Sequence, residues 1–197
     1  MKKILIGTNN KGKVKEYSAL LGNYFDILTP HDLDIEFNVD ETGKSYEENS
    51  LLKLEFLRKK QPNIPILCDD SGLEIKSLNN EPGIFSARYA GKGSGDKENI
   101  DKVLLNLKGI KEREAKFVCL ISFFSKEFSP YPQIFRGECF GTIIEKPDGK
   151  SGFGYDPIFY YEKLHKTFAN LLEHEKNLIS HRALAVEKFL KEVIFNL

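Results

Sequence analysis

The chain has few cysteines, and their spacing excludes several kinds of site. Only three occur among 197 residues, at Cys68, Cys119 and Cys139, and no two of them form a CxxC pair. A zinc site or a thiol-exchange motif built from paired cysteines is therefore excluded. An odd number of widely separated cysteines is typical of a reducing compartment, so we expect a cytoplasmic protein.

The chain also lacks net charge and a long apolar start. Lysines plus arginines number 29 and so do aspartates plus glutamates. Because no overall field attracts nucleic acid or an anionic membrane, any phosphate site must be local. The apolar run after Lys3 has only three residues, 4–6, which is too short for a signal peptide or a membrane span. We expect neither a membrane nor a nucleic acid polymer as partner.

The apolar pattern switches between strand-like runs and helical spacing, which is typical of an α/β protein. Repeats, low-complexity tracts and linkers are absent, so we expect one domain over residues 1–197. The predicted strands are 4–6, 66–68, 73–75, 117–124, 134–140 and 142–144. The predicted helices lie around 14–21, 46–60, 96–107 and 183–194, with Ser45 and Ser180 as N-caps.

A polar loop, residues 7–13, joins the first predicted strand to the first helix. Its amides and Lys13 suit a phosphate held at the N-terminus of the helix. The P-loop pattern G-x-x-x-x-G-K-[ST] fails at its last position, where Val14 offers no hydroxyl to a magnesium ion. A turn that only caps the helix remains the alternative.

A second candidate is a pair of acids, Asp69 and Asp70, that follows the apolar run 66–68. We expect residues 69–72 to form a turn, so that both acids lie at the end of a strand. Mg²⁺ needs only one or two protein carboxylates, which Glu41 and one aspartate supply. Adjacent carboxylates repel each other, so their pKa values can be driven apart, one binding metal and the other accepting a proton. A solvated turn is the alternative.

A third candidate is the glycine-rich segment 152–157. Its glycines allow the backbone to approach a ligand, and Phe153 and Tyr155 offer rings on which a base can stack. Asp156 can accept a hydrogen bond from a ribose or a base. The alternative is an ordinary turn with packed aromatic side chains.

A fourth candidate is a set of cations, Lys176, His181 and Arg182, around the start of the last helix. The positive end of a helix disfavours cations, so a bound anion or another acceptor would explain them. Exposure with screening by salt is the alternative. Together, the four candidates describe a site for a nucleoside triphosphate.

These motifs resemble those of the inosine/xanthosine triphosphate pyrophosphatase family over nearly the whole chain. The residues that carry the resemblance are 8–13 with Glu16, 41–43, Glu48 and Asn49 with Lys53, 69–73, 82–89, 152–157 and 180–182. The resemblance implies an elongated mixed β-sheet flanked by helices, two lobes around a central substrate cleft, and a homodimer. It also implies the conversion of nonstandard purine triphosphates (ITP, dITP, XTP) into the monophosphate and pyrophosphate.

The resemblance also implies roles for individual residues. The implied substrate-binding residues are Thr8, Asn9, Asn10, Lys11, Gly12, Lys13, Lys53, Ser71, Phe153, Gly154, Tyr155, Asp156, Lys176, His181 and Arg182. Glu41 and Asp70 are implied as ligands of Mg²⁺, and Asp70 also as the proton acceptor. Asp69 is implied to join the metal and water network, and we count it with Asp70 and Lys13 as catalytic. Lys11 and the segment 44–46 depart from the usual pattern, which bears on substrate preference.

The mechanism we expect is attack of a water, oriented or deprotonated by Asp70, on the α-phosphorus. Lys13, Lys53 and Lys176 would hold the charge that develops. Two alternatives stay open: a P-loop-like NTPase, against which Val14 argues, and a non-catalytic nucleotide-binding module, which would not need the acids.

Overall fold

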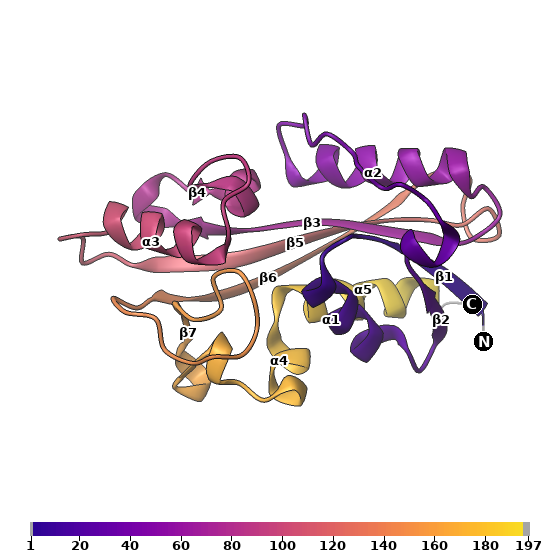
Figure 1. Ribbon diagram of the computed structural model, residues 1–197. Helices are drawn as coiled ribbons and strands as arrows, with labels where there is room; N and C mark the ends of the chain where they lie inside the picture. Colours follow the sequence, from indigo (N-terminus) through magenta and orange to yellow (C-terminus); the bar gives the residue numbers. More distant parts are fainter. Residues whose placement is uncertain (1, 195–197) are drawn as a thin grey trace. The chain divides into compact units, whose positions relative to one another are not determined.

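The computed structural model describes residues 2–194 and shows an α/β fold in which helices flank one mixed sheet (Figure 1). The strands are β1 (Lys2–Gly7), β2 (Phe25–Leu28), β3 (Ile66–Ile75), β4 (Glu81–Pro82), β5 (Glu114–Phe124), β6 (Gln133–Ile143), β7 (Phe159–Tyr161) and β8 (Lys166–Thr167). The helices are α1 (Lys11–Leu21), α2 (Tyr46–Lys60), α3 (Asp96–Asn106), α4 (Glu173–Ile179) and α5 (His181–Val193). Among these described residues, no helix is long and apolar enough to cross a membrane.

The strands follow the order β2-β1-β3-β5-β6-β7-β8, and β4 pairs with β3. β1 is parallel to both β2 and β3, whereas β7 is antiparallel to both β6 and β8. The sheet is therefore mixed, and the predicted fold class is confirmed.

The chain forms two compact units, each assembled from segments that are distant in sequence. The first unit contains the chain up to Asp70, the segment Cys119–Gly137 and the chain from Arg182 onward. The second unit contains Ser71–Val118 and Glu138–His181. The single domain and the cleft between two lobes stay predictions.

The core of the first unit is built on both faces of β1, because successive side chains of a strand point to opposite faces. Ile4 and Ile6 pack in a cluster with Phe189 of α5, and Leu5 packs in a separate cluster with Leu57 of α2. In Figure 1, α1 and α5 accordingly lie on one side of β1 and α2 lies on the other. This arrangement places Lys13 of α1 and Lys53 of α2 beside Asp69 of β3.

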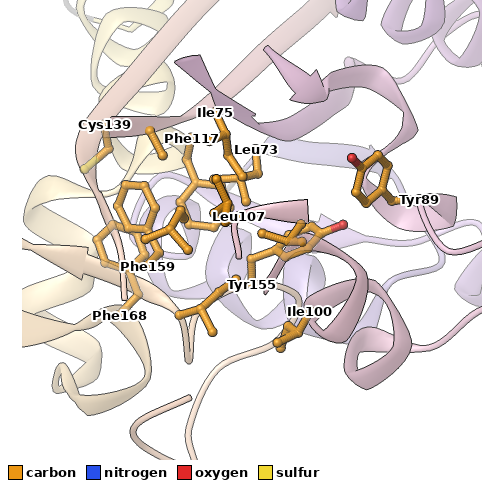
Figure 2. Close-up of a cluster of buried hydrophobic side chains, with 14 of the residues drawn as sticks. Leu73, Ile75, Tyr89, Ile100, Leu107, Phe117, Cys139, Tyr155, Phe159 and Phe168 are labelled. Carbon is orange, nitrogen blue, oxygen red and sulfur yellow. The ribbon is translucent and has the colours of Figure 1, made fainter. Parts of the chain in front are cut away.

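The core of the second unit is a separate apolar cluster, shown in Figure 2. Its aromatic centre is Phe117 of β5, whose ring centroid lies 4.4 Å from that of Phe159 and 5.6 Å from that of Phe168. Leu73 and Ile75 add the second half of β3 to the cluster.

The structure corrects the predicted turn at residues 69–72. β3 runs without interruption from Ile66 to Ile75, and Asp69 and Asp70 lie in the middle of it, only 2% and 5% exposed. Two acids followed by Ser-Gly are typical of a turn, but here cationic side chains compensate the buried carboxylates, so the strand continues. The prediction that the acids lie at the end of a strand is wrong, and so is the alternative of a solvated turn.

The short strands β2, β4, β7 and β8 were not predicted, and two further elements differ from the prediction. The expected strands 134–140 and 142–144 form one strand, β6, because Gly141 marks a close approach and not a break. A Cβ atom at Gly141 would lie 2.4 Å from the carbonyl oxygen of Tyr160 on β7. The short helix α4 was not predicted, because its seven-residue sequence has little apolar periodicity.

Candidate active site

The loop after β1 is a short helix-capping turn. Asn10 is the N-cap of α1, and its Oδ1 accepts a hydrogen bond from the backbone N–H of Lys13 at 3.1 Å. Thr8 Oγ1 accepts from the N–H of Asn10 at 3.1 Å, and Asn9 Nδ2 donates to the carbonyl of Phe37 at 2.6 Å. These bonds fix the loop at the N-terminus of an eleven-residue helix, where anions are favoured.

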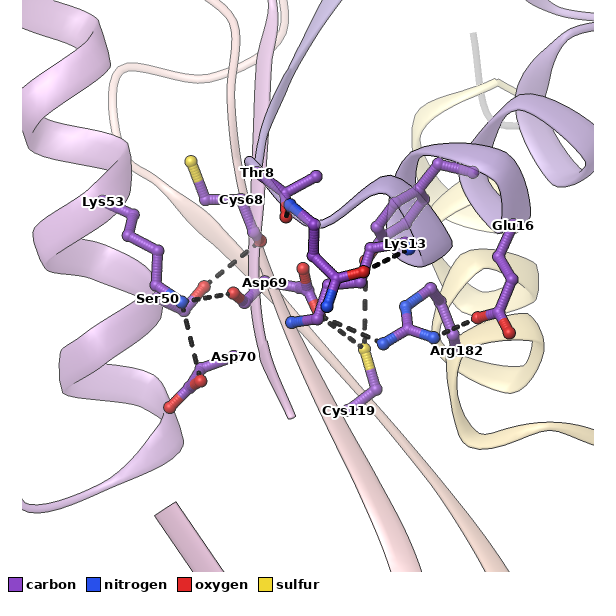
Figure 3. A network of polar contacts seen from close by, with 12 residues as sticks. Thr8, Lys13, Glu16, Ser50, Lys53, Cys68, Asp69, Asp70, Cys119 and Arg182 are labelled. Atoms are coloured by element: carbon purple, nitrogen blue, oxygen red, sulfur yellow. Dashed lines mark hydrogen bonds and ion pairs between the residues drawn. The ribbon is translucent and has the colours of Figure 1, made fainter. Parts of the chain in front are cut away.

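Asp69 lies between two cations, Lys13 of α1 and Arg182 of α5 (Figure 3). Lys13 Nζ is 2.8 Å from Asp69 Oδ2, and Nη2 of Arg182 is 3.6 Å from the same oxygen. Arg182 also forms an ion pair with Glu16 of α1. The acceptors predicted for the cation at the start of α5 are therefore carboxylates of the protein. Arg182 is 1% exposed, so its direct contact with substrate stays a prediction.

Lys53 of α2 brings three oxygens together at one ammonium group. Its Nζ lies 2.7 Å from Glu41 Oε1, 2.8 Å from the carbonyl oxygen of Asp69 and 3.5 Å from Asp70 Oδ1. The expectation that residue 41 and residues 69–70 meet, although far apart in sequence, agrees with this geometry. Their roles in the reaction stay predictions.

The pKa values of Asp69 and Asp70 are shifted in opposite directions. Burial raises the pKa of Asp69, but the charges of Lys13, Arg182 and Lys53 outweigh it and hold the pKa of Asp69 well below its usual value. Burial also raises the pKa of Asp70; Lys53 and Lys13 oppose the rise, but Glu41 adds to it, and the pKa stays above its usual value. Asp69 is therefore the permanent anion of the pair, and Asp70 takes up a proton more readily.

The acids fit a hard divalent cation. Within residues 2–194, no three His, Cys, Asp or Glu side chains cluster closely enough to form a complete protein cage. Mg²⁺ does not require one, since it keeps several waters and binds through one or two carboxylates and the phosphates of a substrate. Glu41 and Asp70 already share one cation, and the buried Oδ1 of Asp69 has no hydrogen-bond partner in this part of the chain.

The loop that carries Glu41 is fastened to the first turns of α2. Ser45 caps the helix by accepting from the N–H of Glu48 at 3.1 Å, while Glu48 Oε2 accepts from the N–H of Lys44 at 2.7 Å. Asn49 Oδ1 accepts from the N–H of Gly43 at 2.9 Å. The sequence identified the N-cap and included Asn49 among the residues that carry the family resemblance, but it assigned Asn49 no role, because no sequence pattern distinguishes a buried asparagine that holds a loop.

In the second unit, Asp156 organises the predicted base loop. Its Oδ2 accepts from the N–H of Phe153 at 3.0 Å and from Lys176 Nζ at 2.6 Å, and both Asp156 and Lys176 are buried. The same ammonium lies 5.2 Å from the ring centroid of Phe153 and 5.6 Å from that of Phe168. The carboxylate thus fixes the loop and a cation beside an aromatic face.

The rings of this unit differ in accessibility. Tyr155 is only 5% exposed, belongs to the apolar core and donates its hydroxyl hydrogen to the carbonyl of Ser86 at 2.7 Å. A stacking role for its ring stays a prediction, as it does for Phe153, which is half-buried. His181 is buried, and its ring centroid lies 4.7 Å from that of Phe117 at an interplanar angle of 19°.

The predicted site residues fall into two groups, one in each unit. The first unit contains Thr8, Asn9, Asn10, Lys11, Gly12, Lys13, Glu41, Lys53, Asp69, Asp70 and Arg182. The second unit contains Ser71, Phe153, Gly154, Tyr155, Asp156, Lys176 and His181. The metal candidates and most of the phosphate candidates therefore belong to the first unit, and Lys176 and most of the base-pocket candidates belong to the second.

Comparisons with known proteins place this geometry in a family. A model described as the Ham1 family matches residues 4–192. A dITP/XTP pyrophosphatase of Staphylococcus epidermidis is 43% identical over 194 residues, which cover 98% of this chain and 97% of the relative. One of Bacillus anthracis is 41% identical over 196 residues, covering 98% and 96%.

Solved structures agree. The Staphylococcus aureus Ham1 protein has a TM-score of 0.87 and 39% identity, with 100% of both chains covered. The nucleoside-triphosphatase / dITP/XTP pyrophosphatase from Mycobacterium abscessus has a TM-score of 0.74 and 34% identity, with 95% of this chain and 98% of that chain covered. The resemblance found from the sequence motifs is confirmed, and the chain belongs to the Ham1 family.

Proposed function

We propose that this chain is a nucleoside triphosphate pyrophosphatase that hydrolyses nonstandard purine nucleoside triphosphates to the monophosphate and pyrophosphate. Relatives that align over nearly the whole chain are named dITP/XTP pyrophosphatase. The observation that carries the proposal is that Glu41 and Asp70 contact the same cation, Lys53. All three residues lie within the segment 4–192 that matches the Ham1 family. Two carboxylates at one cationic position suit a divalent ion that brings a triphosphate with it.

Mg²⁺ is the proposed cofactor, and Glu41 and Asp70 are the residues that would hold it. When bound, Mg²⁺ would polarise phosphoryl oxygens and offset the negative charge that develops on them.

Asp70 is the proposed acceptor of the proton of the attacking water. Burial and the neighbouring Glu41 keep its pKa above the usual value of an aspartate, which moves it toward the range in which a general base works well. Asp69 stays ionised next to it and holds Lys13 and Arg182 in place. The different roles that we propose for Asp69 and Asp70 thus follow from the different charges around the two carboxylates.

The triphosphate would bind at the N-terminus of α1, where backbone amides and Lys13 favour an anion. A phosphate oxygen would then compete with Asp69 for the Lys13 ammonium, 2.8 Å from Asp69 Oδ2 in this structure. Lys53 and Lys176 are the further cations that we propose for the developing charge.

The base would stack on Phe153. The backbone N–H of Phe153 donates to the Asp156 carboxylate, which fixes the position of this residue. Hypoxanthine and xanthine carry a 6-oxo acceptor where adenine carries an amino donor, so donors near His181 and Arg182 would accept the first two bases and oppose adenine. A buried donor that faces another donor is left unpaired, which costs binding free energy and discriminates strongly.

We also propose a homodimer in the cytoplasm. The family resemblance supports the dimer, and the three buried free thiols suit a reducing compartment. Sedimentation of the purified chain with twice the mass of one copy would support the dimer, and the mass of a single copy would exclude it.

The test is a product analysis with ITP, dITP, XTP, GTP and ATP in the presence of Mg²⁺. We expect pyrophosphate and the monophosphate from the first three substrates, and an Asp70→Asn variant that is slower by roughly 100- to 10,000-fold. Inorganic phosphate as first product would indicate cleavage of the γ-phosphate, and equal rates on ATP would defeat the proposed base selection. A folded Asp70→Asn protein that works at the wild-type rate would refute the role of Asp70.

A further inference from the structure

Asn49 is a fully buried side chain that contacts two parts of the candidate metal site. It lies in the first turns of α2 and has 0% exposure. Its Nδ2 donates to Asp70 Oδ2 at 3.1 Å, and its Oδ1 accepts from the N–H of Gly43 at 2.9 Å. One amide group therefore bridges β3 and the loop of Glu41.

The hydrogen bond from Asn49 fixes the orientation of the Asp70 carboxylate, so that its two oxygens face different partners. A primary amide offers donors on one atom and acceptor positions on the other, so its two bonds have a fixed relative geometry. With Oδ2 of Asp70 held by Asn49, the other carboxylate oxygen, Oδ1, is the one that lies 3.5 Å from Lys53 Nζ. Lys53 in turn contacts Glu41, so Asn49 acts on the side of the carboxylate opposite to the shared cation.

The other bond of Asn49 fixes the loop at short range. A Cβ atom at Gly43 would lie 2.7 Å from Asn49 Oδ1 and 2.9 Å from the backbone nitrogen of Asn49. The loop backbone is therefore pressed against α2 two positions after Glu41. A larger or differently shaped side chain at position 49 would move both the loop and the aspartate.

We propose that Asn49 is the positioning residue of the metal site, coupling the orientation of the Asp70 carboxylate to the position of the Glu41 loop. The inference rests on the proposed function for the identity of the metal ligands, but its test does not require turnover. Loss of a hydrogen-bond partner of a metal ligand typically weakens metal binding, because the ligand then pays for its own ordering.

Asn99 provides a matched control. It is 3% exposed and lies in the first turns of α3, as Asn49 does in α2. Its Oδ1 likewise accepts from a loop backbone N–H, that of Ala90, at 2.8 Å. Its Nδ2 donates to the carbonyl of Ala87 at 3.3 Å, so the carboxylate partner is the feature that only Asn49 has of the two.

The experiment titrates the ligand-free protein with Mn²⁺, a paramagnetic substitute for Mg²⁺, and measures free Mn²⁺ by electron paramagnetic resonance. We expect Asn49→Ala to weaken Mn²⁺ binding by roughly tenfold or more, and Asn99→Ala to leave the affinity unchanged although both lose a buried amide. In an Asp70→Asn background, adding Asn49→Ala should cause a smaller further loss than it does in wild type, because only the contact with the Glu41 loop is then left to lose.

Three results would overturn the proposal. These are an unchanged affinity in Asn49→Ala, an equal loss in Asn99→Ala, and a full further loss in the double variant. The outcome is separable from the proposed function. Wild-type protein that binds Mn²⁺ tightly but releases no pyrophosphate from ITP would refute the function, whereas normal pyrophosphate release with equal Mn²⁺ affinity in wild type and Asn49→Ala would refute the role of Asn49.

Discussion

At the scale of single residues, the pKa values of the neighbouring acids differ because Arg182 acts on Asp69 and Glu41 acts on Asp70, while Lys13 and Lys53 act on both. Lys13 and Arg182 approach Asp69, whereas Asp70 shares Lys53 with Glu41. Asp69 therefore has more positive charge around it than its own charge requires, while Asp70 has a competing carboxylate nearby. The opposite pKa shifts of two adjacent residues are a property of their surroundings in the fold.

Loss of Lys53 should lower the stability of the metal-free protein, because its ammonium contacts both Glu41 and Asp70. Lys53→Met keeps the length and apolar part of the side chain but leaves Asp70 and Glu41 without their shared cation. We expect the free energy of unfolding to fall by about 3 kcal/mol, the lower end of the range for a broken buried ion pair, because Glu41 is partly exposed and screened. Urea denaturation without metal measures this change.

The exposed pair of Lys97 and Asp101 supplies the control for that prediction. Lys97→Met removes an ion pair whose side chains are 83% and 56% exposed, so we expect little change in stability. Addition of Mg²⁺ should restore more stability to Lys53→Met than it adds to wild type, because the ion replaces the missing positive charge. A Lys53→Met protein as stable as wild type without metal would contradict the view that Lys53 compensates these acids.

The sequence predicted that the pKa values of Asp69 and Asp70 would diverge, since adjacent carboxylates repel. Which of the two would be raised could not be predicted, because the answer depends on Glu41 and Arg182, distant residues whose placement requires the fold. The same holds for Arg182: the helix dipole predicted an acceptor for it, and only the fold shows that Glu16 and Asp69 are acceptors.

At the scale of elements, the loop before β7 depends on one close contact. Gly152 has φ +81°, and a Cβ atom there would lie 2.0 Å from Asp156 Oδ2, the oxygen that holds Phe153 and Lys176. The glycine thus serves both a left-handed backbone conformation and the approach of a carboxylate.

Gly152→Ala should displace that carboxylate as well as strain the backbone. We expect a loss of stability of about 1–3 kcal/mol together with a raised KM for ITP, because the loop that carries Phe153 loses its anchor. Gly109→Ala is the control, since Gly109 has a similar φ of +79° with no atom within 4 Å of the added Cβ. Equal stability losses and unchanged KM in both variants would show that the contact with Asp156 has no consequence.

The predicted strands differ from the structure more than the predicted helices do. Helices α1, α3 and α5 were predicted from apolar spacing, because each buries one face against a core, and α2 was predicted from the capping box at Ser45 and the run after it. β3 and β6 were each predicted as two pieces, since Asp-Asp-Ser-Gly and Gly141 indicate turns when tertiary contacts are unknown. The ion pairs of Asp69 and the close approach of Tyr160 override those local preferences.

At the scale of the whole molecule, every cysteine is a buried thiol. Burial raises the pKa of Cys119 and of Cys139 from 9.0 to about 12, and it also raises the pKa of Cys68. The folded protein therefore keeps these protons at a pH at which the unfolded chain releases them. Well below pH 9 the thiols are protonated in both states and contribute no pH dependence.

Stability should accordingly fall as the pH rises through the window between the ordinary and the raised pKa of these thiols. Each one contributes a loss of about 1.4 kcal/mol at one pH unit above its unfolded pKa. Urea denaturation at pH 8 and at about pH 10 measures the loss, and a Cys139→Ala variant should lose less than wild type over the same interval. Identical pH dependence of the two proteins would rule out the contribution of Cys139.

The class of the fold followed from the sequence, but the order of its strands and the assembly of its units did not. Apolar runs and helical spacing indicate strands and helices, and the motifs indicate the family. Neither reveals that the segment Cys119–Gly137 joins the unit of β1 while Ser71–Val118 forms part of another. That partition arises from contacts between distant segments, which leave no local pattern in a single sequence.

The burial of all three thiols has a practical consequence. A maleimide dye or a nitroxide label needs an accessible thiolate, and none of the native cysteines offers one. A cysteine introduced at an exposed position, for example by Lys92→Cys, would then be the single labelled position in an otherwise natural chain. Distance and fluorescence measurements on the working protein would need no cysteine-free background.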